Sequence, residues 1–369
     1  SNIILMNNFS HQLINFLDSI QLSCEKYREL KPMYDIFVEK YKNIKLEKVL
    51  IESKKTKLTP SIDIKSSIIK YLSRDTQSLG LSKKNKDFIK GYDAKNISYN
   101  TDWLNVHGKE LNRLTFNMIN NNLLPDRILK HIVDRNLYGE FTSLDVLNEI
   151  ESSIRGNKTL GVKYDGISAL ISINYKKLTA RDIDIIVKRA LILSIVHNIN
   201  IPIKLNLWLT GKKKLLPNNY KILGPKEINS GVTMFSDRTS SILRKEEYGK
   251  LILHELIHFL DIDFKRFNDY DFSKHFNINP NMEIRLFESY TELCACIVNT
   301  ILCSYEYNNR KNYNLFVKFL CYEIKFSIFQ IAKILLFFGF KDINDFVKPY
   351  DGLNRFKQDT SVFSYFFIK

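Results

Sequence analysis

The feature that most constrains this chain is a His-Glu-x-x-His pattern inside an apolar stretch, at His254, Glu255 and His258. Apolar residues at 251–253 and 259–260 flank it, so the segment predicts a buried helix. Residues four apart share one face of a helix, so both imidazoles can bind a single metal ion and Glu255 can reach a water on it. Zn²⁺ binds histidine nitrogens readily and would remove the cost of burying these groups unpartnered. The alternative interpretation is a core helix with two incidental histidines.

A catalytic zinc needs a third protein ligand. The class that uses a histidine ten residues after the first, beyond a glycine, is excluded because Phe264 and Asp261 occupy these positions. Residues 287–296 instead predict a second helix with Glu288 and Glu292 one turn apart on one face. We favour Glu292 as the ligand, with Glu288 beside it. The other register, with Glu288 as the ligand and Glu292 holding a zinc histidine, stays open, as does an exposed acidic pair without metal.

This residue set predicts zinc-dependent hydrolysis of peptide bonds. The metal would lower the pKa of a bound water towards about 7, and Glu255 would accept its proton as general base and pass it to the leaving amine. The oxyanion needs a further donor. The candidates, each more often structural than catalytic, are Tyr290, His275 and Tyr365. A peptide would add as a strand along an exposed sheet edge. A resemblance to zincins, in which the strand before the motif helix commonly serves this way, implies that Gly231, Val232 and Thr233 form this edge.

Two sets of residues carry resemblances to known families. Glu292, followed by Ala295 three positions later, is similar to the ligand glutamate of the gluzincins, which often precedes a small residue at that spacing. Residues 212–217, 222–233, 244–250, 263–264, 288–292 and 359–365 resemble the largely uncharacterised zinc metallopeptidases of large nucleocytoplasmic DNA viruses. These resemblances imply a zincin-like catalytic domain, Zn²⁺ as cofactor, a peptide or protein substrate, and a viral protein of the host cytoplasm.

The order of expected elements indicates an α+β fold in two parts. Residues 1–155 read as mainly helical, with helical apolar periods at 11–22 and 36–50 and a polar linker or surface loop at 73–101. This region serves as a prodomain, a recognition domain or a docking module. Residues 156–369 alternate strand and helix, and form the zincin-like domain with a small mixed sheet, the His-Glu helix and the glutamate helix. Asp165 and Gly166 predict a type I′ hairpin, and Thr179 predicts a helix N-terminus. Further strands are expected at 201–210, 231–235 and 241–243.

The charge of the chain permits other functions. Its formal net charge is +15 over 369 residues, but richness in Asn, Lys and Ile is also the bias of an AT-rich genome. Nucleic-acid binding through the basic surface is therefore an alternative, and not the expected primary role. A second alternative is a catalytically inactive zincin-fold scaffold.

The cysteines and apolar stretches bear on the compartment. The five cysteines are odd in number and form no disulfide framework, which favours a reducing compartment. No secretory signal is visible. The most apolar stretch, residues 326–340, is too short to span a bilayer and predicts a core helix ended by Gly339. We therefore expect a cytoplasmic protein without a membrane span.

Overall fold

The computed structural model describes residues 15–20, 22, 25–45, 50–54, 142–153, 157–174, 178–218, 222–235, 238–263, 268–275, 284–347 and 355–369. Contacts divide the chain into a unit of residues 1–55 and 149–369 and a second unit of residues 56–148. This division does not coincide with the boundary expected near residue 155, because residues 31–54 belong to the first unit. The described part of that unit is a mixed α+β structure.

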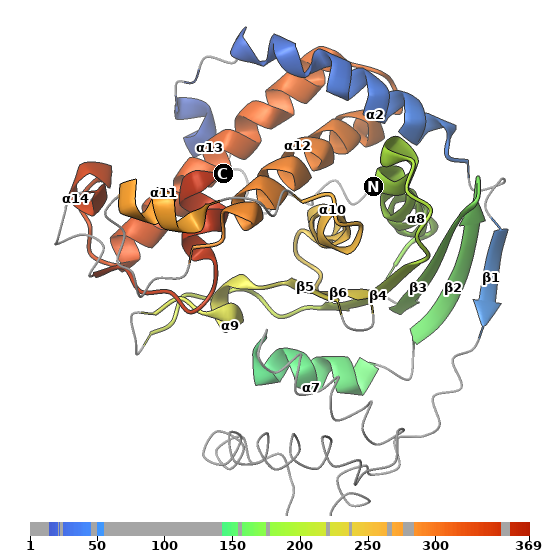
Figure 1. The fold of residues 1–369 in the computed structure, drawn as a ribbon, viewed down its shortest axis with the longest axis horizontal. Coiled ribbons are helices and arrows are strands. Elements are labelled where there is room, and N and C mark those ends of the chain that lie inside the picture. The colour runs from blue at the N-terminus through green and yellow to red at the C-terminus, as the bar shows by residue number, and fades with distance from the viewer. Residues whose placement is uncertain are drawn as a thin grey trace, which may run out of the picture. The chain divides into compact units, whose positions relative to one another are not determined.

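A six-stranded mixed sheet forms the base of the first unit, in the order β1-β2-β3-β4-β6-β5 (Figure 1). The strands are β1 (Leu50–Lys54), β2 (Asn157–Tyr164), β3 (Ile167–Asn174), β4 (Ile203–Thr210), β5 (Gly231–Met234) and β6 (Thr239–Arg244). The β2–β3 hairpin turns at Asp165 and Gly166, whose φ angles of 48° and 79° are those of the predicted type I′ turn. Strand β4 runs parallel to β3 and β6, whereas β5 pairs antiparallel with β6 and ends the sheet.

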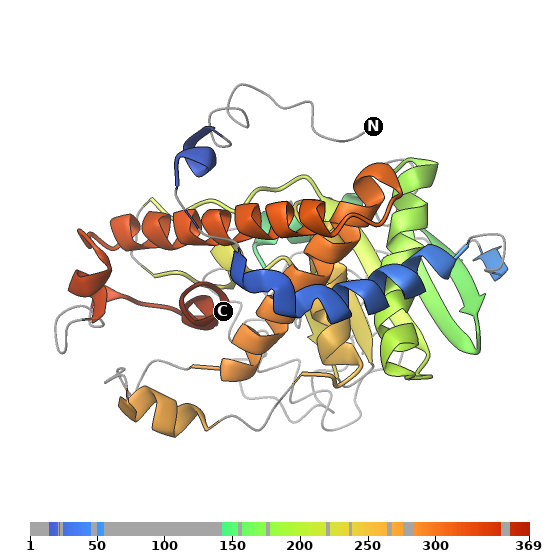
Figure 2. The ribbon, with the colours of Figure 1, turned by 90° about the horizontal axis from the view of Figure 1, so that it is seen from above.

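Helices α8 and α10 cover one face of this sheet, and α12 forms a second layer on α10. The helices are η1 (Glu25–Leu30), α2 (Lys31–Asn43), α7 (Leu144–Ser153), α8 (Ala180–His197), α9 (Pro225–Ile228), α10 (Tyr248–Phe259), α11 (Asp269–His275), α12 (Leu286–Asn308), α13 (Tyr313–Phe337), α14 (Ile343–Val347) and η6 (Ser364–Ile368). Figure 2, seen from above, shows α2 and α13 crossing over α12. Helix α8 begins at Thr179, whose side chain forms the predicted capping box with Asp182.

A buried polar cluster fixes α12 against its neighbours. Arg189 on α8 donates hydrogen bonds to Asn299 (2.6 Å) and Glu306 (2.9 Å) on α12. The Tyr41 hydroxyl of α2 also donates to Glu306. On α10, a Cβ added to Gly249 would lie 2.8 Å from the Arg189 guanidinium, so glycine leaves the room that this side chain needs. Buried charges of this kind require defined partners, so the cluster sets the register between α8 and α12.

An aromatic cluster holds the last described segment in place. Phe346 stacks on Phe367 with ring centroids 4.7 Å apart, and Phe363 stacks on Phe367 at 5.4 Å. Phe356 packs edge-on against Phe367. Gly339, with φ of 80°, follows the end of α13 as predicted. This packing carries η6 back to the helical layer, where it contacts α12 and α13.

Some expectations for the N-terminal region were wrong or fall outside the described residues. The apolar pattern at 36–50 suggested one continuous helix, but α2 ends at Asn43 and Leu50 starts strand β1. Of residues 11–22, only 15–20 and 22 are described, and 15–19 are helical. The predicted loop at 73–101 lies outside the described part of the chain.

Two observations concern the cysteines and the apolar helices. Cys321 on α13 is disulfide-bonded, which departs from the expectation that the cysteines lack disulfides, whereas Cys294, Cys296 and Cys303 are free thiols.

Among the described residues, one helix, α12, is long and apolar enough to cross a bilayer by length and composition. Of its most apolar window, 61% is buried inside the protein, as in a core helix.

Candidate metal centre

Helix α10 places the two histidines of the motif side by side. Residues 251–259 are all buried, since this helix lies between the sheet and α12. One turn apart on the same face, His254 and His258 direct their Nε2 atoms toward one point, and these atoms are 3.3 Å apart. The spacing of the motif thus predicted the arrangement of these two imidazoles.

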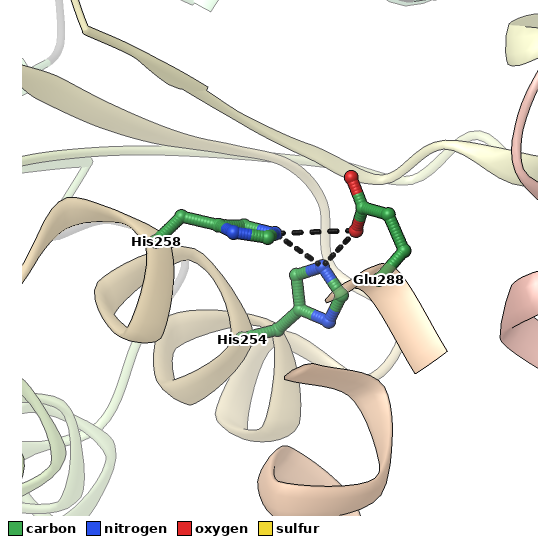
Figure 3. Close-up of side chains that lie close together, drawn as sticks. All are labelled: His254, His258 and Glu288. Atoms are coloured by element: carbon green, nitrogen blue, oxygen red, sulfur yellow. Dashed lines mark hydrogen bonds and ion pairs between the residues drawn. The ribbon is translucent and has the colours of Figure 1, made fainter. Parts of the chain in front are cut away.

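Glu288 completes a cluster of three with the histidines (Figure 3). Its Oε2 lies 3.2 Å from Nε2 of His258 and 3.5 Å from Nε2 of His254. These three buried atoms form a group that could hold a metal ion. In a tetrahedral site with zinc–ligand distances of about 2.05 Å, neighbouring ligand atoms are about 3.3 Å apart. The donor set therefore fits a tetrahedral metal with one position left over.

Glu288, and not the favoured Glu292, lies next to the two Nε2 atoms. Glu292 does not face the Nε2 atoms; its Oε2 lies 3.0 Å from Nδ1 of His254, on the far side of the ring. Glu288 lies in the first turn of α12, and Glu292 lies one turn further along the helix. The alternative register, in which Glu288 faces the cation position and Glu292 holds a histidine, is the one that the arrangement fits.

Asp263 is a site residue that the sequence did not reveal. Its Oδ2 lies 2.8 Å from Nδ1 of His258, the counterpart of the contact between Glu292 and His254. The chain reaches this position because Asp261, with φ of 57°, turns it back just after α10. An ionised carboxylate can only accept a hydrogen bond from each Nδ1, so in their neutral form the two imidazoles would direct their Nε2 lone pairs at the shared point.

The charges in this cluster attract either protons or a cation to that point. Burial alone would lower the pKa of His254, but hydrogen bonds with Glu288 and Glu292 outweigh it and raise the pKa to about 10. Burial likewise opposes protonation of His258, and Asp263 and Glu288 raise its pKa to about 9. Although burial would raise the pKa of Glu288, the two histidines hold it well below its usual range. Protons and a divalent cation would compete for the same lone pairs.

Glu255 lies on α10 against strand β5. Thr233 donates a hydrogen bond of 2.7 Å to its Oε2, and a Cβ added to Gly231 would lie 2.5 Å from its Oε1. Burial raises the pKa of the Glu255 carboxyl, against the opposing effect of His254 and His258. A carboxylate with a raised pKa next to a metal position is suited to accept a proton.

The three proposed oxyanion donors lie in different places. The Tyr365 ring, on η6, packs edge-on against His254 with centroids 5.9 Å apart, and its hydroxyl hydrogen-bonds Glu288. Burial, with Glu288 next, raises the pKa of Tyr365 well above its usual range, so the phenol keeps its proton. Tyr290 is 36% exposed and hydrogen-bonds Cys294 instead. His275 ends α11, and its side chain lies outside the described residues.

A cleft of about 500 Å³ leads to this cluster. Its walls come from β5, α10, α13 and η6, with Gly231, Lys250, His254, Phe326, Phe329 and Tyr365 among the lining residues. Strand β5 forms the sheet edge beside the cleft, which is where the sequence placed Gly231, Val232 and Thr233. Of the three cluster residues His254 lines this cleft, together with Glu255, so a ligand larger than water can approach these two side chains.

Comparison with known proteins gives one partial likeness. The chain is 29% identical over 122 residues to "Uncharacterized protein R210" of Acanthamoeba polyphaga mimivirus, an alignment that covers 31% of this chain. The chain spans 30% of the length of that relative. No family model matches the chain. No solved structure matches it either. Part of this chain is thus similar to a mimivirus protein, and its chemistry has to be argued from the site.

Proposed function

We propose that this chain is a zinc-dependent hydrolase of peptide bonds, of gluzincin type, with a zincin-like catalytic domain. One observation carries the proposal: Nε2 of His254, Nε2 of His258 and Oε2 of Glu288 lie 3.2–3.5 Å from one another. Three such atoms can lie this close only when protons or a cation are shared between them, because bare lone pairs repel one another. The order of sheet, α10 and α12 supports the zincin-like assignment.

The donor types favour zinc and a hydrolytic role. Two histidines and one carboxylate suit zinc, and a similar set can hold non-haem iron in oxygenases. Glu255 separates the two chemistries, because a hydrolase needs a base next to the metal and an oxygenase does not. Its carboxylate is buried beside the histidines and faces the cleft. When bound, zinc would supply a Lewis acid and lower the pKa of water at the open position.

The side chains around the metal position have separate roles in this proposal. Glu255 accepts a proton from the attacking water and returns it to the leaving amine. Thr233 holds the Glu255 carboxylate by its hydrogen bond to Oε2. Glu292 and Asp263 each hold one imidazole by its Nδ1 proton, which keeps both Nε2 atoms free. The Tyr365 hydroxyl, beside Glu288, donates a hydrogen bond to the developing oxyanion.

In this proposal the substrate binds along the edge of the sheet formed by β5. An extended peptide can add a strand to β5, since among the described strands this one has a neighbour on only one side. Glu255 contacts β5 at Gly231 and Thr233, so a peptide bound there would pass the general base. The substrate is therefore a polypeptide that binds in extended form.

The test compares wild type with Glu255→Gln. Metal content is measured by mass spectrometry of the purified full chain, and hydrolysis by profiling new termini in a peptide library. We expect one zinc per chain in both proteins and cleavage only by wild type. The matched control His258→Ala should lose both metal and cleavage. Unchanged turnover by Glu255→Gln would refute the general base, and wild type that binds no zinc would refute the metal site.

A further inference from the structure

A second cavity lies on the other side of α13, away from the metal cleft. Its volume is about 740 Å³, and it lies between η1, the start of α2 and the first half of α13. None of its described lining residues lines the metal cleft. We call it the α13 groove, and the lining residues that carry the argument are Arg28, Lys31, Tyr313, Lys318, Tyr322 and Lys325.

The groove is elongated along the helix. Asn314, Lys318, Cys321 and Lys325 follow one another at intervals of three and four positions, so they form a single stripe on α13. At a rise of 1.5 Å per residue this stripe is about 16 Å long. Such a length exceeds a single phosphate and matches a short run of linked anionic groups.

The groove carries more positive than negative charge. Four of its described lining residues are cationic, Arg28, Lys31, Lys318 and Lys325, and the acid among them is Asp18. Asp18 accepts a hydrogen bond of 2.6 Å from the Tyr322 hydroxyl. Lys31 pairs with Asp35 at 2.8 Å. Within the described part of the chain, the other three cations have no carboxylate partner, so an anionic ligand would supply one.

Tyrosine rings flank the cationic stripe. The Lys31 ammonium lies over Tyr313 at 5.5 Å, and the Lys325 ammonium lies over Tyr322 at 5.7 Å from the ring centroid. Tyr313 and Tyr322 are nine positions apart on α13, on opposite flanks of the stripe. Aromatic rings beside a positively charged track are the arrangement that binds single-stranded nucleic acids, whose bases stack while their phosphates pair with cations.

We propose that the α13 groove binds single-stranded nucleic acid. The phosphates contact Arg28, Lys318 and Lys325, and the bases stack on Tyr322 and Tyr313. This binding site is separate from the proposed hydrolytic site and does not depend on it, because the two cavities share no described lining residue. Glu255→Gln therefore binds nucleic acid as wild type does.

The first experiment measures binding of the full chain to fluorescein-labelled 12-mers of thymidine and of uridine by fluorescence anisotropy. The double variant Lys318→Gln/Lys325→Gln should bind about tenfold more weakly, with a salt slope smaller by about 1.4, as expected for two lost phosphate contacts. The matched control Lys163→Gln/Lys204→Gln removes the same charge from exposed lysines of β2 and β4. It should keep wild-type affinity. Comparing the affinities of the two oligonucleotides shows whether the groove distinguishes DNA from RNA.

A second variant separates nucleic acid from other polyanions. Tyr322→Leu should weaken oligonucleotide binding about tenfold, the size of one lost base stack, and leave binding of inorganic polyphosphate unchanged. Two results for wild type and the groove variant would overturn the proposal: no oligonucleotide binding by wild type at low salt, or wild-type affinity in Lys318→Gln/Lys325→Gln. Two further results would also overturn it: a loss of affinity in Lys163→Gln/Lys204→Gln equal to that in Lys318→Gln/Lys325→Gln, or wild-type oligonucleotide affinity in Tyr322→Leu. The last result would indicate a general polyanion site.

Discussion

Gly231 lies so close to Glu255 that a Cβ at this position would come within 2.5 Å of the Glu255 Oε1. The backbone of β5 and the proposed general base are therefore in direct contact. Thr233, two residues along the same strand, binds the other carboxylate oxygen. The sheet edge that would receive a peptide also sets the position of the base that would act on it.

The change Gly231→Ala should move Glu255 and leave the metal ligands in place. We expect zinc content close to wild type, a fall in kcat of about 100-fold or more for a base displaced by about 1 Å, and a cost of about 1–3 kcal/mol in the free energy of unfolding from overpacking. Chemical denaturation and metal analysis provide the readouts. Gly224→Ala is the matched control, because its added Cβ would meet only ordinary contacts of 3.6 Å and 3.7 Å. Equal activity in the two variants would contradict this account.

The two glutamates of α12 should differ in their effect on metal binding. Glu288→Gln removes a charge from the three-atom cluster, so we expect loss of bound zinc. Glu292→Gln keeps all three ligand atoms and weakens only the support of His254, so zinc should still bind, about 10–100-fold more weakly. Competition with a chromophoric chelator measures both affinities. The opposite ranking would restore Glu292 as the ligand.

Asp263 should matter as much as Glu292 despite its place in a loop. Asp263→Ala removes the acceptor of the His258 Nδ1 proton, and we expect a loss of about 10–100-fold in zinc affinity. The variant Asp261→Ala changes the preceding turn. It tests whether the left-handed backbone conformation at Asp261, with φ of 57°, is needed to bring Asp263 next to His258. Unaltered zinc affinity in Asp263→Ala would show that His258 is oriented by packing alone.

The cluster around Glu306 predicts how stability depends on pH. Burial would raise the pKa of Glu306, but Arg189 outweighs it and holds the pKa below its usual value of 4.5. Because its pKa is lower in the folded than in the unfolded chain, ionised Glu306 stabilises the folded protein at pH values above the unfolded-state pKa. This stabilisation is lost as the pH falls through the folded-state pKa. Glu306→Gln should flatten the acid limb of unfolding curves measured between pH 7 and pH 3.

The same variant should also be less stable near pH 7. Arg189 is 2% exposed and would keep a buried, unpaired charge, at a cost of about 3–5 kcal/mol. Glu39→Gln is the control, because Glu39 pairs with Lys42 on an exposed surface and contributes little. A pH dependence identical to that of wild type would mean that Glu306 does not set the acid stability.

The local parts of the fold were predictable from the sequence, and the choice between the two glutamates was not. The spacing of His254 and His258 and the turn at Asp165 depend on residues close in sequence, so their periodicity and turn chemistry were sufficient. Helical periodicity places Glu288 and Glu292 on one face and cannot rank them. That ranking follows from how α12 lies on α10, which the contacts of Arg189 help to fix across residues more than a hundred positions apart.

Two further features needed the three-dimensional structure. Asp263 reaches His258 only because the chain reverses at Asp261, and an aspartate in that conformation carries no specific sequence signal. The segment at 36–50 read as one helix because its apolar residues also satisfy a helical period. Its last residue, Leu50, instead begins β1, since pairing with β2 was not visible in the local pattern.

The docking of α12 has a consequence for biosynthesis. A nascent chain that has emerged only as far as residue 285 already carries both imidazoles and Glu255, but neither acid of α12. The third donor arrives when α12 is made and seats against Arg189, which belongs to a helix synthesised much earlier. The ion-binding set is therefore complete only after every strand of the sheet that would present a substrate has been synthesised.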